Sequence, residues 1–270
     1  MQANSMELNG IYYESRGSGP LLLFIAGGNG DAGPFAPTAQ LLADRFTTVA
    51  YDRRGFSRSA PGSGSGDRLA QDSADAAMLI EQLGDGPAYV FGSSSGAIVG
   101  LDLATRRPDL VRAFVCHEPP LLHLLPDGDE WLAFLDEVHA EYQANGAIAA
   151  MAKFNARIGA PPPMRPAAGE LPPHVVELIE RMNRNLDLFL ETELRQYTRY
   201  APDFDALGRI SDRILLVGGA AGREFVPYRP NLVIADWLGS RVTDLPGDHI
   251  GYATSPAEFA PALAALLSAH

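Results

Sequence analysis

Residues 89–96 carry the most specific chemical pattern in the chain. An apolar run ends there in Gly-x-Ser-x-Gly, with Ser94 at its centre, and a helical pattern over 97–107 follows. A strand, a sharp turn and a helix in this order expose a serine as a nucleophile. Gly92 and Gly96 supply positions without a Cβ, where backbones can approach closely. We therefore interpret Ser94 as a nucleophile, and not as part of a serine-rich surface loop.

A serine hydroxyl needs a base within hydrogen-bond reach and a third group that orients the base. Of the six histidines, His249 comes late in the chain, after the last predicted strand and a Pro-Gly-Asp sequence. The serine–acid–histidine order places the base there, whereas a histidine that merely caps a turn is the alternative. His117 follows a strand, and we expect it to point elsewhere. We interpret the remaining four as surface or packing residues: His123, His139, His174 and His270.

The acid has two candidates. Its common location is the loop after the predicted strand 213–218, but that loop contains no aspartate and offers only Glu224. Glu118 ends the strand that neighbours the nucleophile's strand, so its carboxylate could reach the same histidine from another direction. We favour Glu118 over Glu224, and the alternative for Glu118 is a buried glutamate that binds loop backbone.

An oxyanion hole needs two backbone N–H groups near the reacting carbonyl. Ser95, the residue after the nucleophile, supplies one. The glycine-rich segment 26–31 supplies the other, and we expect it from Gly28. A phosphate-binding loop is the rival interpretation of this segment, but neither the Gly-Lys-Ser/Thr ending nor the dinucleotide spacing is present.

The elements around these motifs alternate between strands and helices. Apolar runs over 21–25, 46–51, 89–91 and 111–116 are typical of strands buried on both faces of a parallel sheet. Helical patterns follow them, one of them capped by Asp67. This alternation predicts a doubly wound α/β sheet whose ligands bind at the carboxyl ends of the strands. An Asn9-Gly10 turn predicts a hairpin near the start.

The alternation of strands and helices stops between 119 and 204, where only helical patterns occur. We expect helices over 130–145, 147–158 and 174–200, with proline-rich linkers around 160–173. The sequence thus predicts a helical lid at 119–204, inserted into a core made of 1–118 and 205–270. Four aromatic residues of the lid are candidates for the substrate pocket, or else for the lid's own core: Trp131, Phe134, Phe154 and Phe189.

The polar turn 52–59 contains three arginines. Such a cluster could bind an acidic substrate, but buried polar groups are usually paired within the protein. We favour the structural interpretation.

Composition limits the class of partner. The net charge of −12 over 270 residues argues against nucleic acid and anionic membranes. One cysteine, Cys116, permits no internal disulfide, and the N-terminus resembles no signal peptide, so we expect a reducing, cytoplasmic location. We expect a monomer or a homodimer.

These motifs resemble the α/β-hydrolase fold family, and within it the zearalenone lactonase group. The matching segments are 92–97, 116–119 and 246–249, with Tyr252 shortly after; the resemblance covers the sheet and is weak in the lid. It implies a Ser–Glu–His triad with Glu118 as the acid, and oxyanion donors at Gly28 and Ser95. In that group a lid tryptophan contacts the macrolactone, and Phe189 matches its position, which keeps apolar surface and loses the indole donor.

The expected function is that of a cofactor-independent, metal-free serine hydrolase that cleaves an ester or lactone of a hydrophobic small molecule. Zearalenone-like macrolactones are one candidate substrate. Haloalkane dehalogenases also place a glutamate at this strand end, but they need an aspartate nucleophile, so Ser94 argues against that chemistry and against epoxide hydrolysis. A carbon–carbon bond hydrolase or a thioesterase could use the same triad. A non-catalytic binding protein on this scaffold is the alternative from another class.

Overall fold

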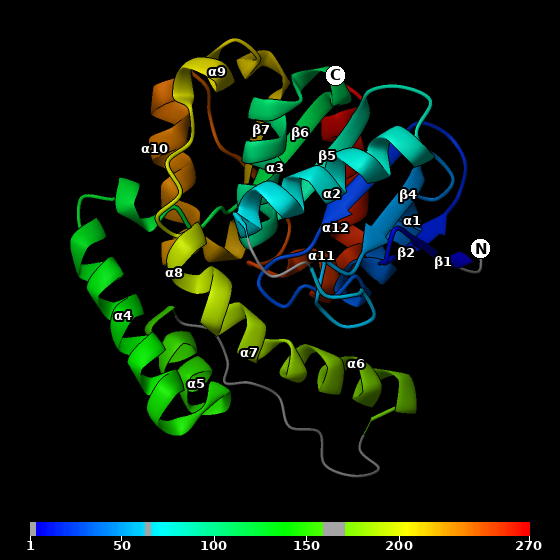
Figure 1. Ribbon diagram of the computed structural model, residues 1–270. Coiled ribbons are helices and arrows are strands. Elements are labelled where there is room, and N and C mark those ends of the chain that lie inside the picture. The colour runs from blue at the N-terminus through cyan, green and yellow to red at the C-terminus, as the bar shows by residue number, and fades with distance from the viewer. Residues whose placement is uncertain (1–3, 63–65, 159–170) are drawn as a thin grey trace.

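The computed structural model describes residues 4–62, 66–158 and 171–270 (Figure 1). Within these residues the chain forms one eight-stranded sheet in the order β1-β2-β4-β3-β5-β6-β7-β8. β2 pairs antiparallel with β1 and β4, and the other neighbours pair parallel. The strands are β1 Asn4–Leu8, β2 Ile11–Arg16, β3 Leu21–Ile25, β4 Thr47–Tyr51, β5 Ala88–Ser93, β6 Val111–His117, β7 Ile214–Gly219 and β8 Thr243–Leu245.

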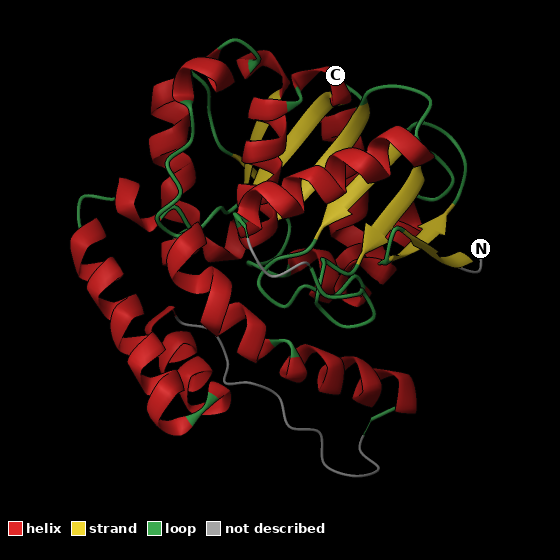
Figure 2. Cartoon of the chain, in the orientation of Figure 1, coloured by secondary structure: helices red, strands yellow, loops and turns green. Residues whose placement is uncertain are grey.

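Helices cover both faces of the sheet, as Figure 2 shows. Alternation along β3 illustrates why: Leu23 and Ile25 belong to the apolar core on one face, and Leu22 and Phe24 to the core on the other. The first core is completed by α2 Arg68–Leu83, α3 Ser95–Arg106, α9 Phe204–Gly208 and α10 Arg229–Leu238, and the second by α1 Ala36–Leu42, α11 Gly251–Thr254 and α12 Pro256–Leu267. Strands buried on both faces are therefore apolar throughout, as expected for a doubly wound sheet.

Two local predictions are confirmed in detail. Asn9 and Gly10 join β1 to β2, and both have positive φ, 51° and 78°, as a tight hairpin turn requires. The Asp67 carboxylate accepts hydrogen bonds from the backbone N–H groups of Leu69 and Ala70 and so caps α2.

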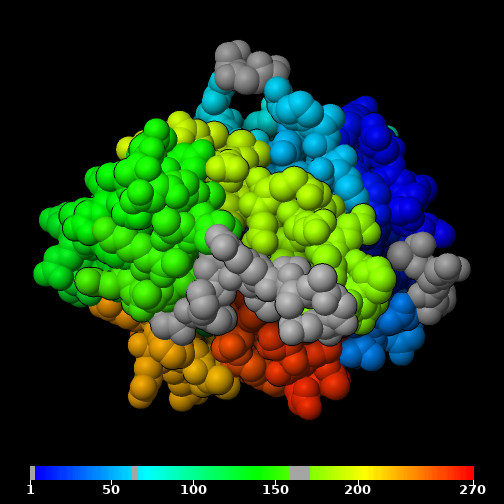
Figure 3. All heavy atoms as spheres, turned by 90° about the horizontal axis from the view of Figure 1, so that it is seen from below, coloured from blue at the N-terminus to red at the C-terminus, as the bar shows by residue number. Residues whose placement is uncertain are grey.

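A helical segment over residues 119–200, between β6 and β7 in the sequence, lies beyond the carboxyl ends of the parallel strands (Figure 1). It contains α4 Gly128–Asn145, α5 Ala147–Ile158 and α6 Pro173–Arg184, and then a run of shorter helical pieces. Its apolar side chains form a third core with Phe56 and Val226 of the sheet's loops. In Figure 3 this segment, coloured green to yellow-green, spreads across the face seen from below. We refer to it as the lid.

The predicted helical stretch over 174–200 is largely helical in the structure, but it is not one regular α-helix. The chain instead passes from α6 through α7 Leu186–Leu188 and a π-helical turn, Phe189–Glu193, to α8 Leu194–Tyr197. Asn185, at the turn between α6 and α7, contacts the core: its side chain hydrogen-bonds the Ser57 N–H and the Asn29 carbonyl. Part of the predicted proline-rich linker (159–170) and part of the loop 61–66 lie outside the described residues.

Candidate active site

Ser94 stands between β5 and α3 in a strained backbone conformation. Its φ is 56° and its ψ is −124°, a combination that side-chain-bearing residues rarely adopt and that is often found at functional sites. The glycines around it are required by close approach. A Cβ on Gly92 would lie 2.3 Å from the Gly96 carbonyl oxygen, and a Cβ on Gly96 would lie 2.1 Å from the Ile25 carbonyl oxygen. The predicted strand–turn–helix geometry is therefore present.

Glu118 and His249 meet although 131 residues separate them along the chain. The Glu118 Oε2 atom lies 2.5 Å from His249 Nδ1, and Glu118 Oε1 accepts a hydrogen bond from the Gly219 N–H at 2.8 Å. Glu118 itself is buried and has a positive φ of 49°, which turns its side chain at the end of β6. These two contacts hold both oxygens of the carboxylate in place.

The charge state of Glu118 determines which nitrogen of His249 carries the proton. Burial alone would raise the pKa of Glu118, but the His249 hydrogen bond and the other contacts hold that pKa below its ordinary value. An ionised carboxylate only accepts hydrogen bonds, so His249 Nδ1 must donate. The Nε2 atom of the neutral imidazole is then an acceptor, which is the state that a general base needs.

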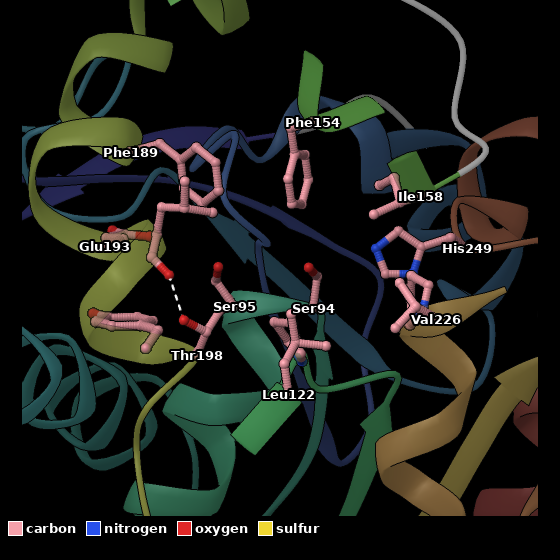
Figure 4. A pocket seen from close by; sticks show the side chains of 14 residues that line it. Ser94, Ser95, Leu122, Phe154, Ile158, Phe189, Glu193, Thr198, Val226 and His249 are labelled. Atoms are coloured by element: carbon pink, nitrogen blue, oxygen red, sulfur yellow. Dashed lines mark hydrogen bonds between the residues drawn. The ribbon is translucent and has the colours of Figure 1, made fainter. Parts of the chain in front are cut away.

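Ser94 and His249 line the same cavity, where no direct hydrogen bond joins them among the described residues. Figure 4 shows the Ser94 hydroxyl and the His249 ring on its wall, with Phe154 and Phe189 close by. Nucleophile–base contacts are often longer in ligand-free sites than in substrate complexes. The structure thus brings Ser94, Glu118 and His249 to one place.

His117 lies beneath His249 and does not line the cavity. The two rings stack with centroids 5.9 Å apart and planes 21° apart, and His117 Nδ1 lies 2.9 Å from the Ser93 hydroxyl. Burial lowers the pKa of His117 to about 4, and the nearby His249 contributes to that shift. At neutral pH the ring is therefore neutral and serves as a packing surface for His249.

The two backbone N–H groups predicted as oxyanion donors make no hydrogen bond in the described part of the chain. Ser95 is the first residue of α3, so its N–H has no intrahelical acceptor. The Gly28 N–H makes no hydrogen bond within the described part of the chain. Gly27, next to it, is adjacent to the nucleophile, since a Cβ placed there would lie 3.1 Å from Ser94 Cβ.

The cavity and its opening to solvent together enclose about 550 Å³ that no protein atom fills. Most of its lining is apolar, and the polar exceptions besides Ser94 and His249 are Ser95, Glu193, Tyr197 and Thr198. The apolar lining residues are Pro120, Leu122, Phe154, Ile158, Phe189, Leu194, Val226 and Pro227.

Of the four aromatic candidates, the structure places Phe154 and Phe189 at the cavity but not Trp131 and Phe134. These two rings pack edge to face in the lid's own core, with centroids 6.0 Å apart, and the Arg157 guanidinium lies over both. Their side chains are buried against α4 and α5 neighbours, so they cannot reach the cavity.

The other candidates lie away from the site. Glu224 is exposed, and no contact with His249 is found in the described residues. His123 and His139 each hydrogen-bond a lid carbonyl, and His174 and His270 are exposed.

The polar turn 52–59 ties loops together, as the structural interpretation predicts. Arg53 is fully buried and binds Asp72, Glu193 and the Gly27 carbonyl, and Arg54 binds Asp75.

The sequence analysis missed Glu193 and Thr198 at the cavity, since a helical pattern alone does not reveal which turn of a helix faces a cavity. A carboxylate on the otherwise apolar inner face of the 186–194 pattern was the available signal.

Among the described residues, none of the helices combines the length and the apolar composition of a membrane span.

A family model described as alpha/beta hydrolase fold matches residues 20–254. The uncharacterized hydrolase YraK of Bacillus subtilis (strain 168) is 36% identical over 260 residues, covering 94% of this chain and 90% of YraK. A 2-(acetamidomethylene)succinate hydrolase of Mesorhizobium japonicum is 43% identical over 102 residues, 37% of this chain and 36% of that protein.

Solved structures agree on the fold. The thermophilic esterase from Thermogutta terrifontis, in its malate-bound form, superposes with a TM-score of 0.72 at 18% identity, covering 99% of this chain and 98% of that one. The eight-stranded, mostly parallel sheet of the described residues, with helices on both faces, is the architecture expected from the sequence. The chain belongs to the α/β-hydrolase fold family, and it is a hydrolase.

Proposed function

We propose that the protein is a serine hydrolase that cleaves an ester or lactone of a hydrophobic small molecule through an acyl-enzyme intermediate. The observation that carries this proposal is the Glu118–His249 hydrogen bond at the cavity that Ser94 also lines. A nucleophile, a base and an acid that orients the base are the groups that acyl transfer needs.

The reaction begins when Ser94 Oγ attacks the carbonyl carbon and His249 Nε2 takes the hydroxyl proton. Glu118 stabilises the imidazolium that forms. The Ser95 and Gly28 N–H groups bind the oxyanion of the tetrahedral intermediate. His249 then gives its proton to the leaving alcohol oxygen, and the C–O bond breaks. A water molecule, deprotonated by the same base, attacks the acyl-enzyme and releases the acid and free Ser94.

The walls of the cavity favour an apolar acyl group or an apolar lactone ring. Phe154, Phe189 and Ile158 offer apolar surface, and the hydroxyls of Ser95 and Thr198 can each orient a polar substituent. A macrolactone of the zearalenone kind is one candidate, because the resemblance to the lactonase group aligns Phe189 with the lid position at which that group uses a tryptophan.

The proposal is tested with p-nitrophenyl esters of graded acyl length and with zearalenone, against the wild type and Ser94→Ala. We expect turnover of medium-length esters by the wild type and a loss of about 10⁵–10⁶-fold in Ser94→Ala. Equal rates in the two proteins would refute the role of Ser94. Opening of the zearalenone ring, followed by chromatography, decides whether the lactone belongs among the substrates.

A carbon–carbon bond hydrolase or a thioesterase is the second candidate, because the same triad serves either reaction. The local similarity to a protein named 2-(acetamidomethylene)succinate hydrolase widens the range of bonds to be tested. Profiling with acyl thioesters, β-diketones and enamides beside the oxygen esters distinguishes these chemistries. A kcat/KM for any of them that exceeds the best ester by tenfold would move the assignment to that bond.

A further inference from the structure

The buried arginine of the polar turn contacts the peptide that carries the proposed oxyanion donor. Arg53 Nη2 donates a hydrogen bond to the Gly27 carbonyl oxygen at 2.8 Å, and the Gly30 N–H donates to the same oxygen at 2.9 Å. The Gly27 carbonyl and the Gly28 N–H belong to one planar trans peptide, so they point in opposite directions. Fixing the Gly27 oxygen therefore fixes the direction of the Gly28 N–H.

This peptide needs such a constraint because it joins two glycines. Glycine populates a wider range of φ and ψ than other residues, so a peptide plane between two glycines can rotate at little cost. A donor that rotates away from the oxyanion loses its effect, since the benefit of an oxyanion hole depends on donors that are oriented before the reaction.

Arg53 is itself held rigidly. Its Nη1 and Nη2 atoms form a fork with the two oxygens of Glu193, both at 2.7 Å, and Nη1 also binds Asp72 at 2.6 Å. Burial alone would lower the pKa of Arg53, but Glu193 and Asp72 raise that pKa well above its ordinary value. The Tyr197 hydroxyl donates to Asp72 at 2.9 Å, and the Nη2 atom of the partly exposed Arg68 lies 3.2 Å from the same carboxylate.

The lid also contacts this peptide directly, at Gly28. The Phe189 ring lies against Gly28, where a Cβ would be 2.4 Å from a ring carbon. Phe189 and Glu193 are the two ends of the π-helical turn, and π-helical turns often mark functional sites. The lid thus reaches the glycine peptide twice, directly through Phe189 and indirectly through Glu193 and Arg53.

We infer that Arg53 is a positioning residue that, held by Glu193 of the lid, orients the Gly27–Gly28 peptide so that the Gly28 N–H serves as an oxyanion donor. This inference rests on the proposed function. It assigns to the arginine a role in transition-state stabilisation through the backbone, without contact with the substrate.

The test compares a p-nitrophenyl ester with the matching thionoester, in which sulfur replaces the carbonyl oxygen. Sulfur is a weak hydrogen-bond acceptor, so a thionoester gains little from oxyanion donors. Arg53→Lys keeps a positive charge between the two carboxylates but lacks the fork that reaches Gly27. Arg54→Lys is the matched control, because Arg54 lies in the same turn and binds Asp75 bidentately, without contact with Gly27.

We expect Arg53→Lys to lower kcat for the ester about tenfold, which is less than the 10²–10³-fold loss typical of a deleted donor. The thionoester rate and the KM for the ester stay near their wild-type values, so the ester-to-thionoester ratio falls about tenfold, whereas Arg54→Lys keeps the wild-type ratio. A ratio is independent of the folded fraction of the sample. Equal losses for both substrates in Arg53→Lys, or the same fall in Arg54→Lys, would overturn the inference.

Two further variants keep the outcomes separate. If Arg53→Lys does not fold, the triple variant Arg53→Met/Asp72→Asn/Glu193→Gln removes the three fully buried charges together and leaves only the partly exposed Arg68 of this network. It carries the same expected fall in the ratio. Turnover retained in Ser94→Ala would overturn the proposed function itself. Loss in Ser94→Ala together with a wild-type ratio in the arginine variants would overturn only the positioning role.

Discussion

Glu118 and Glu193 are both buried carboxylates that bind a nitrogen-containing side chain. Glu193 lines the cavity, and Glu118 binds His249, which lines it. Glu118, at the end of β6, binds His249, whose imidazole is the general base of the proposed reaction. Glu193, in the lid, binds Arg53, which stays protonated at any working pH. The first pair is suited to moving a proton, and the second to holding two parts of the chain in a set geometry.

The surroundings of the two pairs agree with this division. His249 is partly exposed to the cavity, so a substrate can reach it, whereas Arg53 is sealed from solvent. Burial raises the pKa of Glu193 while Arg53 opposes that shift; Glu118 has a pKa below its ordinary value. The difference teaches that burial of a carboxylate says little about its role until its partner is known.

The sharpest way to break this comparison is to make both glutamates neutral without changing their shape. Glu118→Gln leaves the His249 imidazolium unstabilised, and we expect kcat/KM to fall about 10³–10⁴-fold, or ~4–5 kcal/mol of transition-state stabilisation. Glu193→Gln should lower it about tenfold or less. Ester kinetics on the two purified variants measure both effects, with the exposed Glu224→Gln as the control that stays at the wild-type rate. Equal losses for Glu118 and Glu193 would contradict the division of roles.

The Arg53–Glu193 network, expected to matter less than Glu118 for the reaction rate, should matter strongly for the free energy of unfolding. Arg53→Met removes the buried cation of Asp72 and Glu193 and leaves them only the partly exposed Arg68, whose Nη2 lies 3.2 Å from Asp72 and 3.6 Å from Glu193. Breaking such a buried network typically costs ~3–5 kcal/mol of unfolding free energy. Urea unfolding followed by circular dichroism measures the change. Arg107→Met removes exposed ion pairs with Glu81 and Asp109 and should change stability little. A similar loss in both arginine variants would show that burial of the network has no special weight.

The pH dependence of stability sharpens the account of the Glu118 region. His117 has a folded-state pKa of about 4, below the unfolded value, so the unfolded chain takes up a proton first as pH falls. His117 therefore destabilises the fold progressively between about pH 6.5 and pH 4, by ~2–3 kcal/mol at pH 4.5, and contributes no such slope above that window. His117→Asn keeps a hydrogen-bonding partner for Ser93 and should lose this part of the acid destabilisation.

Urea titrations of the wild type and His117→Asn at pH 7.5 and pH 4.5 measure this slope as a difference between the proteins. Parallel losses of stability in the two proteins would mean that His117 is accessible to protons in the folded state.

The smallest expected effect concerns the two aromatic groups of the lid. Phe154→Ala enlarges the cavity, so we expect the preferred acyl chain to lengthen and KM for medium-length esters to rise several-fold, within the ~1–3 kcal/mol typical of pocket contacts. Trp131→Ala removes a side chain of the lid's own core and should leave the acyl-length profile unchanged. Profiles of kcat/KM against acyl length for both variants decide this, and an altered profile in Trp131→Ala alone would reverse the assignment.

The structure of the sheet region could be predicted from the sequence because each of its features depends on a few adjacent residues. The buried strands, the Asn9-Gly10 turn, the Asp67 cap and the glycines around Ser94 each follow from a few adjacent residues. The pairing of Glu118 with His249 could be proposed because parallel strands end at one edge of a sheet, which brings distant residues together.

The structure of the lid could be predicted less well from the sequence because tertiary contacts decide its local conformation. The 174–200 pattern is helical throughout, but it does not reveal that Asn185 binds the core loops or that the turn ending at Glu193, which binds Arg53, is π-helical. Periodicity alone could not tell that Trp131 packs within the lid whereas Phe189 reaches Gly28, since both lie on apolar helix faces.

The central claim is that Ser94 becomes acylated during turnover. Rapid acid quenching of the wild type with a p-nitrophenyl ester, followed by peptide mass spectrometry, measures this directly. We predict that the acyl mass appears on Ser94 within the first turnover, accumulates in Glu118→Gln in proportion to its residual rate of acylation, and is absent in Ser94→Ala. Steady turnover with no acyl group on Ser94, or an acyl group carried by another residue, would contradict the account.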